Sequence, residues 1–213
     1  MLLKHKFLIR ILLLILVSIV TWMALTATAA LGSREYSKPN ITNRPDGLAA
    51  WQRVYSVLTS PRCINCHTAT NYPQQADDRH RHFANVIRGP EGKGVAGLNC
   101  LSCHQQANAD STGVPGGHNW HLAPLSMRWQ DANDRPLSSA AVCRAVTNRA
   151  KNNGLDGPAL VKHHDEEPLV LWAWNPGRRP DGSMRTLPPL SHAEFVAATR
   201  TWVEAGMPCP QGR

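Results

Sequence analysis

The sequence reads CINCH at residues 63–67 and CLSCH at residues 100–104, two copies of one pattern in a chain of 213 residues. Two cysteines three positions apart lie on the same side of one helical turn, so both sulfurs of a pair can bond the two vinyl groups of one porphyrin. The histidine that follows then points under the ring, where its imidazole can ligate iron. The two copies therefore predict two covalently attached c-type haems.

In this interpretation each motif divides its residues between attachment and ligation. The attaching cysteines are Cys63, Cys66, Cys100 and Cys103, and the proximal iron ligands are His67 and His104. One alternative is a zinc ribbon with four thiolate ligands, but it leaves both histidines unexplained and needs an unusually long separation between the pairs. A second alternative is a disulfide within each pair, which an exported protein would tolerate.

The first thirty residues predict export. Lys4, Lys6 and Arg10 precede a nearly unbroken apolar run, and Ala27-Thr28-Ala29 has the small-x-small spacing of signal peptidase sites. The uncharged stretch is about twenty residues long, enough to span a bilayer, so residues 7–30 are an alternative membrane anchor. Either way, the positive start places the rest outside the cytoplasm. We expect a periplasmic protein, soluble after cleavage of residues 1–30 or tethered to the inner membrane.

Beyond this segment we expect a linker over residues 31–45 and one dihaem domain over residues 46–213. Apolar spacing predicts a helix from an Asp46 cap to near Pro61, a second from residue 138 to near Gly154, and a short third over residues 156–164. Ser191 and Glu194 form a capping box that opens a last helix. Because no useful alternating run occurs, the predicted fold class is mostly α, with short helices, long loops and no substantial sheet.

Two cysteines lie outside the motifs. In an oxidising compartment, Cys143 and Cys209 are expected to form a disulfide that joins the last helix to the helix around residue 143. Two unlinked buried thiols are the alternative. Whether Cys143 and Cys209 form a disulfide or stay unlinked, no set of four cysteines remains for an iron-sulfur cluster.

The sixth ligand of each iron must come from elsewhere in the chain. The candidates are His80, His82, His118, His121, His163, His164, His192, Met127, Met184 and Met207. His82 ranks first because an imidazole has no packing role in its charged, turn-rich stretch, and His164 ranks with it because an apolar run follows. Met127 and His121 come next, in the tryptophan-bearing loop after the second motif. Methionine ligation would raise the haem potential.

Charge and aromatic content narrow the function further. The net charge is +8, but lysines and arginines are scattered rather than gathered in a stripe, which argues against a nucleic-acid partner. There are seven tryptophans, which we expect mainly to fill the core, although some can line haem edges.

Several further stretches carry a family resemblance, namely residues 51–66, 88–94, 120–127, 169–177 and 206–210. Over residues 46–210 the chain resembles the bacterial dihaem c-type cytochromes labelled isoquinoline 1-oxidoreductase subunit. The resemblance implies a redox partner such as a periplasmic dehydrogenase or molybdenum hydroxylase, and a downstream electron acceptor. Because the chain lacks the cysteines and the molybdopterin domain of such an enzyme, it would be the accessory cytochrome.

The sequence therefore favours an electron carrier without substrate turnover. The enzyme alternative is a peroxidase-like dihaem protein, in which one iron keeps an open position for hydrogen peroxide. A haem-based sensor is a third interpretation, which the lack of a following signalling domain disfavours.

Overall fold

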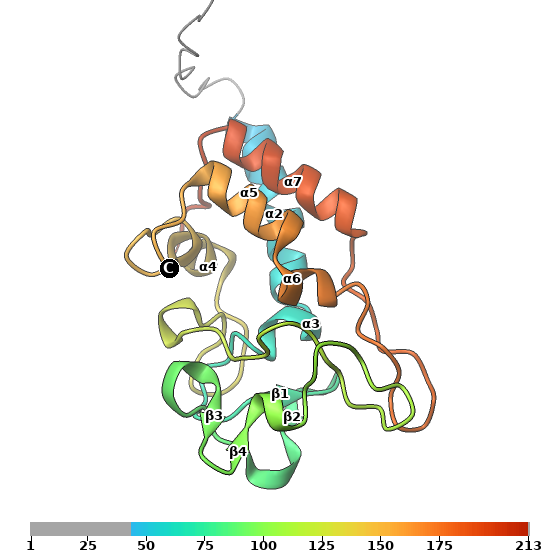
Figure 1. The fold of residues 1–213 in the computed structure, drawn as a ribbon. Coiled ribbons are helices and arrows are strands. Elements are labelled where there is room, and N and C mark those ends of the chain that lie inside the picture. The colour runs from blue at the N-terminus through green and yellow to red at the C-terminus, as the bar shows by residue number, and fades with distance from the viewer. Residues whose placement is uncertain (1–43, 213) are drawn as a thin grey trace, which may run out of the picture. The chain divides into compact units, whose positions relative to one another are not determined.

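A computed structural model describes residues 44–212 (Figure 1). The signal peptide or anchor expected over residues 1–30, and nearly all of the linker expected over residues 31–45, lie outside the described residues. The helices are α2 (Arg44–Leu58), α3 (Pro61–Ile64), α4 (Ser139–Val146), α5 (Gly157–Glu166), α6 (Pro168–Trp172) and α7 (His192–Glu204). Between α3 and α4 the chain runs mainly as loops. No helix of the described part is long and apolar enough to cross a membrane.

The loop region contains two antiparallel strand pairs of two residues each. Strand β1 (Gln74–Gln75) pairs with β2 (His80–Arg81), and β3 (Gly94–Val95) pairs with β4 (Leu98–Asn99). The single-turn 3-10 helices are η2 (Phe83–Asn85), η3 (Pro90–Gly92), η4 (Cys100–Ser102) and η5 (Leu125–Met127). The prediction of a mostly α fold with long loops and no substantial sheet is therefore confirmed.

The core lies where α2 and α7 pack side by side (Figure 1). Trp51 of α2 and Trp202 of α7 are both fully buried, with ring centroids 4.8 Å apart. Each indole N–H is satisfied: Trp51 donates to the hydroxyl of Ser139 at 2.8 Å, and Trp202 donates to the carbonyl of Pro208 at 3.0 Å. These bonds tie the two helices to α4 and to the C-terminal segment.

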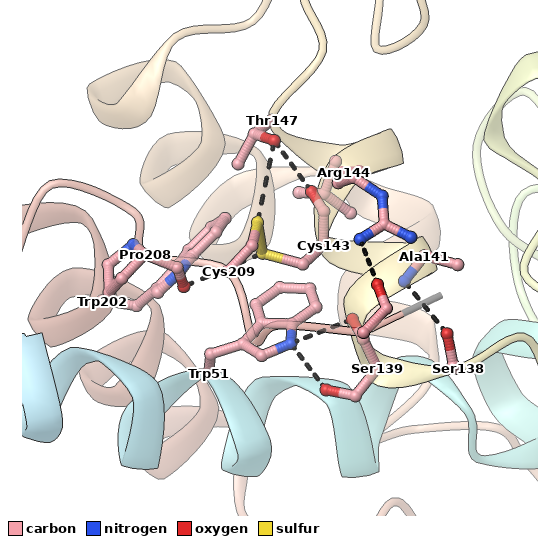
Figure 2. The surroundings of a disulfide bond; sticks show 12 residues. Trp51, Ser138, Ser139, Ala141, Cys143, Arg144, Thr147, Trp202, Pro208 and Cys209 are labelled. Carbon is pink, nitrogen blue, oxygen red and sulfur yellow. Dashed lines mark hydrogen bonds between the residues drawn. A yellow bond between two sulfur atoms is a disulfide. The ribbon is translucent and has the colours of Figure 1, made fainter.

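The predicted disulfide between Cys143 and Cys209 is present, and it lies beside this pair of tryptophans (Figure 2). It links α4 to the segment that follows α7. The peptide carbonyl of Cys143 also accepts the Thr147 hydroxyl at 2.9 Å. The C-terminal segment is thus fixed to the core by a covalent bond as well as by the Trp202 hydrogen bond.

The helix ends follow the predicted capping in part. Ser138 caps α4 by accepting from the Ala141 N–H, Asp156 caps α5, and both hydrogen bonds of the capping box are present at α7. However, α4 ends at Val146 rather than near Gly154. The side chain of Asn148 accepts the N–H of Ala150 at 3.0 Å, an Asx turn that competes with further helix.

The expected first helix also begins earlier than predicted. It spans Arg44–Leu58, so Asp46 lies within its first turn instead of capping it. A carboxylate in a first turn still interacts favourably with the helix dipole. The helix ends shortly before Pro61, and its direction brings the chain to the first CxxCH motif.

Candidate functional site: two histidine-tryptophan centres

The first CxxCH motif lies on α3 and the turn that follows it, at the wall of a cavity of about 450 Å³. Cys63, Cys66 and His67 all line this cavity, with apolar side chains of α2, α4, α5 and α7 around them. Burial raises the pKa of the Cys63 thiol to about 12 and that of Cys66 to about 11. Both thiols are free and half-buried at the surface of an apolar space.

His67 is held on two sides. Its Nδ1 lies 2.6 Å from the carbonyl oxygen of Met127, and its ring stacks on Trp129 with centroids 3.4 Å apart and 6° between the planes. A carbonyl can only accept, so Nδ1 carries the proton and Nε2 keeps its lone pair. Burial lowers the pKa of His67 to about 3, so the ring stays neutral. A fixed neutral imidazole with a free Nε2 is the form that ligates a metal.

The second CxxCH motif repeats this arrangement in a different local structure. It begins in η4, which opens with the side chain of Asn99 accepting the N–H of Leu101 at 2.9 Å. Nδ1 of the buried His104 lies 2.7 Å from the carbonyl oxygen of Pro115, and its ring stacks on Trp120 with centroids 4.7 Å apart and 8° between the planes. His104 therefore also presents an unprotonated Nε2.

His82 lies beside His104, as a distal ligand would. The two ring centroids are 5.9 Å apart, with 69° between the planes, and Nδ1 of His82 lies 2.6 Å from the carbonyl oxygen of Phe83. A metal–imidazole bond is about 2 Å and the ring centroid lies roughly 1 Å behind the nitrogen, so two imidazoles on one ion have centroids about 6 Å apart. The separation of His82 and His104 fits one iron between them.

His164 lines the first cavity together with His67. Its Nδ1 lies 2.9 Å from the hydroxyl of Thr199, and that hydroxyl donates its own proton to the carbonyl of Phe195 at 3.0 Å. Because the Thr199 hydroxyl has one proton and donates it to Phe195, it must accept the Nδ1–H of His164. Nε2 of His164 is therefore the unprotonated nitrogen. His192 is oriented differently, because its Nε2 donates to the carbonyl of His164 at 3.0 Å.

The other two ranked candidates, Met127 and His121, also line the first cavity. The backbone carbonyl of Met127 accepts the Nδ1–H of His67. Nδ1 of His121 lies 2.5 Å from the carbonyl of Asn119, a local contact in a partly exposed turn. His163, the neighbour of His164, lines the cavity as well.

Arg62 adds a charged group to the cavity wall. It is buried, forms an ion pair with Asp77, and lies over the ring of Trp172, with 5.9 Å between its guanidinium carbon and the ring centroid. Burial lowers its pKa, yet the group remains a cation. Its Nε–H has no hydrogen-bond partner among the described residues, which suits a carboxylate such as a haem propionate.

Sequence reasoning missed the groups that orient these histidines. Trp129 and Trp120 were expected mainly as core residues. Trp129 does belong to the core, and each of the two also stacks on a CxxCH histidine. The two carbonyl acceptors belong to Met127 and Pro115, and a backbone carbonyl leaves no mark in a sequence. Only the closeness of Trp120 and Trp129 to the second motif offered a signal.

The two alternatives to haem fit the structure less well. Among residues 44–212, no three or more histidine, cysteine or acidic side chains converge on one point, as a zinc ribbon requires. The cysteines of both motifs are free thiols rather than disulfides.

Comparisons with protein-family models, with curated proteins and with solved structures found no match.

Proposed function

We propose that the protein is an electron carrier with two covalently attached c-type haems. One observation carries this proposal: the histidines of both CxxCH motifs donate Nδ1–H to a backbone carbonyl, at 2.6 Å for His67 and 2.7 Å for His104, and both stack on a tryptophan. The same orientation arises twice from unrelated surroundings. It supports a shared task, which is to present Nε2 to iron.

In this proposal Cys63, Cys66, Cys100 and Cys103 attach the two groups through their sulfurs, and His67 and His104 are the proximal ligands. When bound, the haems would supply reversible one-electron chemistry at iron. Trp129 covers one face of His67 and fixes its plane. Arg62 offers a buried positive charge to an acidic substituent.

A second histidine is available at each site, and this favours a carrier over a peroxidase. His82 lies 5.9 Å from His104 between ring centroids, and His164 lines the cavity of His67 with its Nε2 free. If His82 with His104 and His164 with His67 held the two irons, no open position would remain for peroxide. Ligation by two histidines also favours low potentials relative to histidine-methionine ligation.

The proposal includes a place and a partner that rest on the sequence alone. The apolar N-terminus supports a periplasmic domain, and the family resemblance supports a dehydrogenase or molybdenum hydroxylase as electron donor.

Covalent haem counting tests the proposal directly. We would express the full chain with a c-type maturation system and measure its pyridine haemochrome spectrum and its mass. Two haems are expected in the wild type, and one in each of the double variants Cys63→Ala/Cys66→Ala and Cys100→Ala/Cys103→Ala. Recovery of haem-free wild-type protein, under conditions that mature a control cytochrome, would overturn the proposal.

A further inference from the structure

Trp120 joins the two centres. Its ring stacks in parallel on His104 of the second motif, with centroids 4.7 Å apart and 8° between the planes. Its ring also meets Trp172 edge-on, at 4.8 Å and 87°. Both indoles line the cavity that contains His67 of the first motif. One aromatic side chain thus contacts the proximal ligand of one centre and borders the other centre.

The backbone after Trp120 fixes this position from both sides. The N–H of Leu122 donates to the carbonyl of Gly92 at 2.9 Å, in the loop that leads to the second motif. The next N–H, that of Ala123, donates to the carbonyl of Cys66 in the first motif at 3.3 Å. Consecutive residues therefore bond to the neighbourhoods of both motifs.

Trp172 is fixed as well. Its indole N–H donates to the side-chain oxygen of Asn108 at 3.0 Å, and the same oxygen accepts the N–H of Gly116 at 3.0 Å. The guanidinium of Arg62 lies over the Trp172 ring. The aromatic pair is thus held between the first motif and the loop that follows the second one.

We propose that Trp120 provides the electronic contact between the two haem sites, an inference that rests on the proposed function. With both haems bound, one electron would pass from ferrous iron at one site to ferric iron at the other, so that the first iron is oxidised and the second is reduced. No bond forms or breaks and no proton moves. The indole stays neutral and supplies orbital overlap between His104 and the first cavity. Trp120 is therefore a positioning and coupling residue.

A packing role alone explains Trp120 less well. The core tryptophans, Trp51 and Trp202, are fully buried and pack against each other inside the hydrophobic core, whereas Trp120 is only half-buried. Its ring contacts among the described residues are with His104 and Trp172, both of which belong to the two centres.

The test compares Trp120→Leu with Trp120→Phe in the full-length dihaem protein. Trp174 supplies the matched control, because its ring contacts Phe195 and His192 and it does not line the first cavity. For each variant we would count haems, titrate both potentials, and then deliver less than one electron per protein from a photogenerated flavin semiquinone. Redistribution of that electron between the haems is followed by absorbance.

Wild type, Trp120→Phe and Trp174→Leu are expected to show fast redistribution that does not depend on protein concentration. Trp120→Leu should retain two haems and lose the fast phase, because leucine removes the aromatic ring but still fills part of its space with apolar atoms. A Trp120→Leu protein with two haems, unchanged potentials and the wild-type rate would overturn the inference. Haem-free wild-type protein would instead contradict the proposed function.

If Trp120→Leu does not take up the second haem, the inference is tested on the wild-type protein by NMR. In the NMR spectrum of protein with ¹⁵N-labelled tryptophan, the Trp120 indole signal is expected to shift when either haem is ferric. A Trp120 signal that responds to only one of the two irons would overturn the inference.

Discussion

The hydroxyl of Thr199 on α7 accepts the Nδ1–H of His164 on α5 at 2.9 Å, and it donates its own proton to the carbonyl of Phe195. Both side chains are buried, so this contact is not shared with water. The orientation of His164 in the first cavity therefore depends on one hydroxyl group. Metal-ligating histidines generally have such a partner for their other ring nitrogen.

We predict that Thr199→Val weakens the first centre. Valine has nearly the same shape as threonine but leaves the Nδ1–H of His164 without an acceptor, and a buried unsatisfied donor costs about 1–3 kcal/mol. The free energy of unfolding should fall by that amount, measured by urea denaturation. One haem should also change its low-spin electron paramagnetic resonance signal.

Thr201→Val is the control for this change, because Thr201 lies on the exposed side of the same helix. It should leave both the stability and the spectrum unchanged. If Thr199→Val behaves like Thr201→Val, His164 does not ligate iron through the geometry described above.

The second centre offers a separate test at His82, which lies in a partly exposed turn. Replacing His82 by alanine should cost little stability but open the sixth position of one iron. We expect the reduced variant to bind carbon monoxide at one haem of the two, whereas the reduced wild type binds none. Replacing His82 by methionine should raise the potential of one haem.

His80→Ala is the matched control, because His80 lies two residues away and its Nδ1 pairs with the exposed Asp78 at 2.7 Å. It should bind no carbon monoxide. Carbon monoxide binding by the wild type would show an open iron site and would favour the peroxidase interpretation.

Several helices were predictable because apolar spacing and capping residues act locally. Ser138 and the Ser191–Glu194 box cap the helices that they were expected to open, whereas Asp46, the expected cap of α2, lies within its first turn. The arrangement of the loop region was not predictable, because it depends on distant backbone contacts. The N–H of Trp129, for example, donates to the carbonyl of His67 at 2.8 Å.

The candidate site also has a part that local sequence predicts and a part that depends on tertiary structure. The two CxxCH motifs and His82 could be named from local sequence, since their spacing or their surroundings are unusual. The acceptors for His67 and His104 are carbonyls of residues 127 and 115, which any residue type could supply. The contacts of Trp120 with His104 and of Thr199 with His164 likewise depend on tertiary structure that no spacing rule encodes.

The capping box of α7 predicts a dependence of stability on pH. Hydrogen bonds from the side chain and backbone of Ser191 hold the pKa of Glu194 below its ordinary value of 4.5. A carboxylate with a lowered folded-state pKa stabilises the fold above its unfolded-state pKa and loses that effect as the pH falls through the folded-state value.

Glu194→Gln keeps a side chain that can still accept in a capping box but removes the charge. Its deficit in unfolding free energy should be constant near neutral pH and should shrink as the pH falls below 4.5. Denaturation with urea at several pH values, followed by circular dichroism, measures this. Glu204→Gln, an exposed change at the other end of α7, should show no such convergence.

The disulfide gives the largest expected change in stability. Cys143 and Cys209 are separated by 66 residues in the sequence, and closing a loop of this length restricts the unfolded chain by about 4 kcal/mol in the chain-entropy model. Replacing both residues by serine should lower the free energy of unfolding by about that amount. Both haems should remain, because neither cysteine lines the first cavity or belongs to a motif. Loss of a haem in the double variant would mean instead that the link between α4 and the C-terminal segment shapes the haem sites themselves.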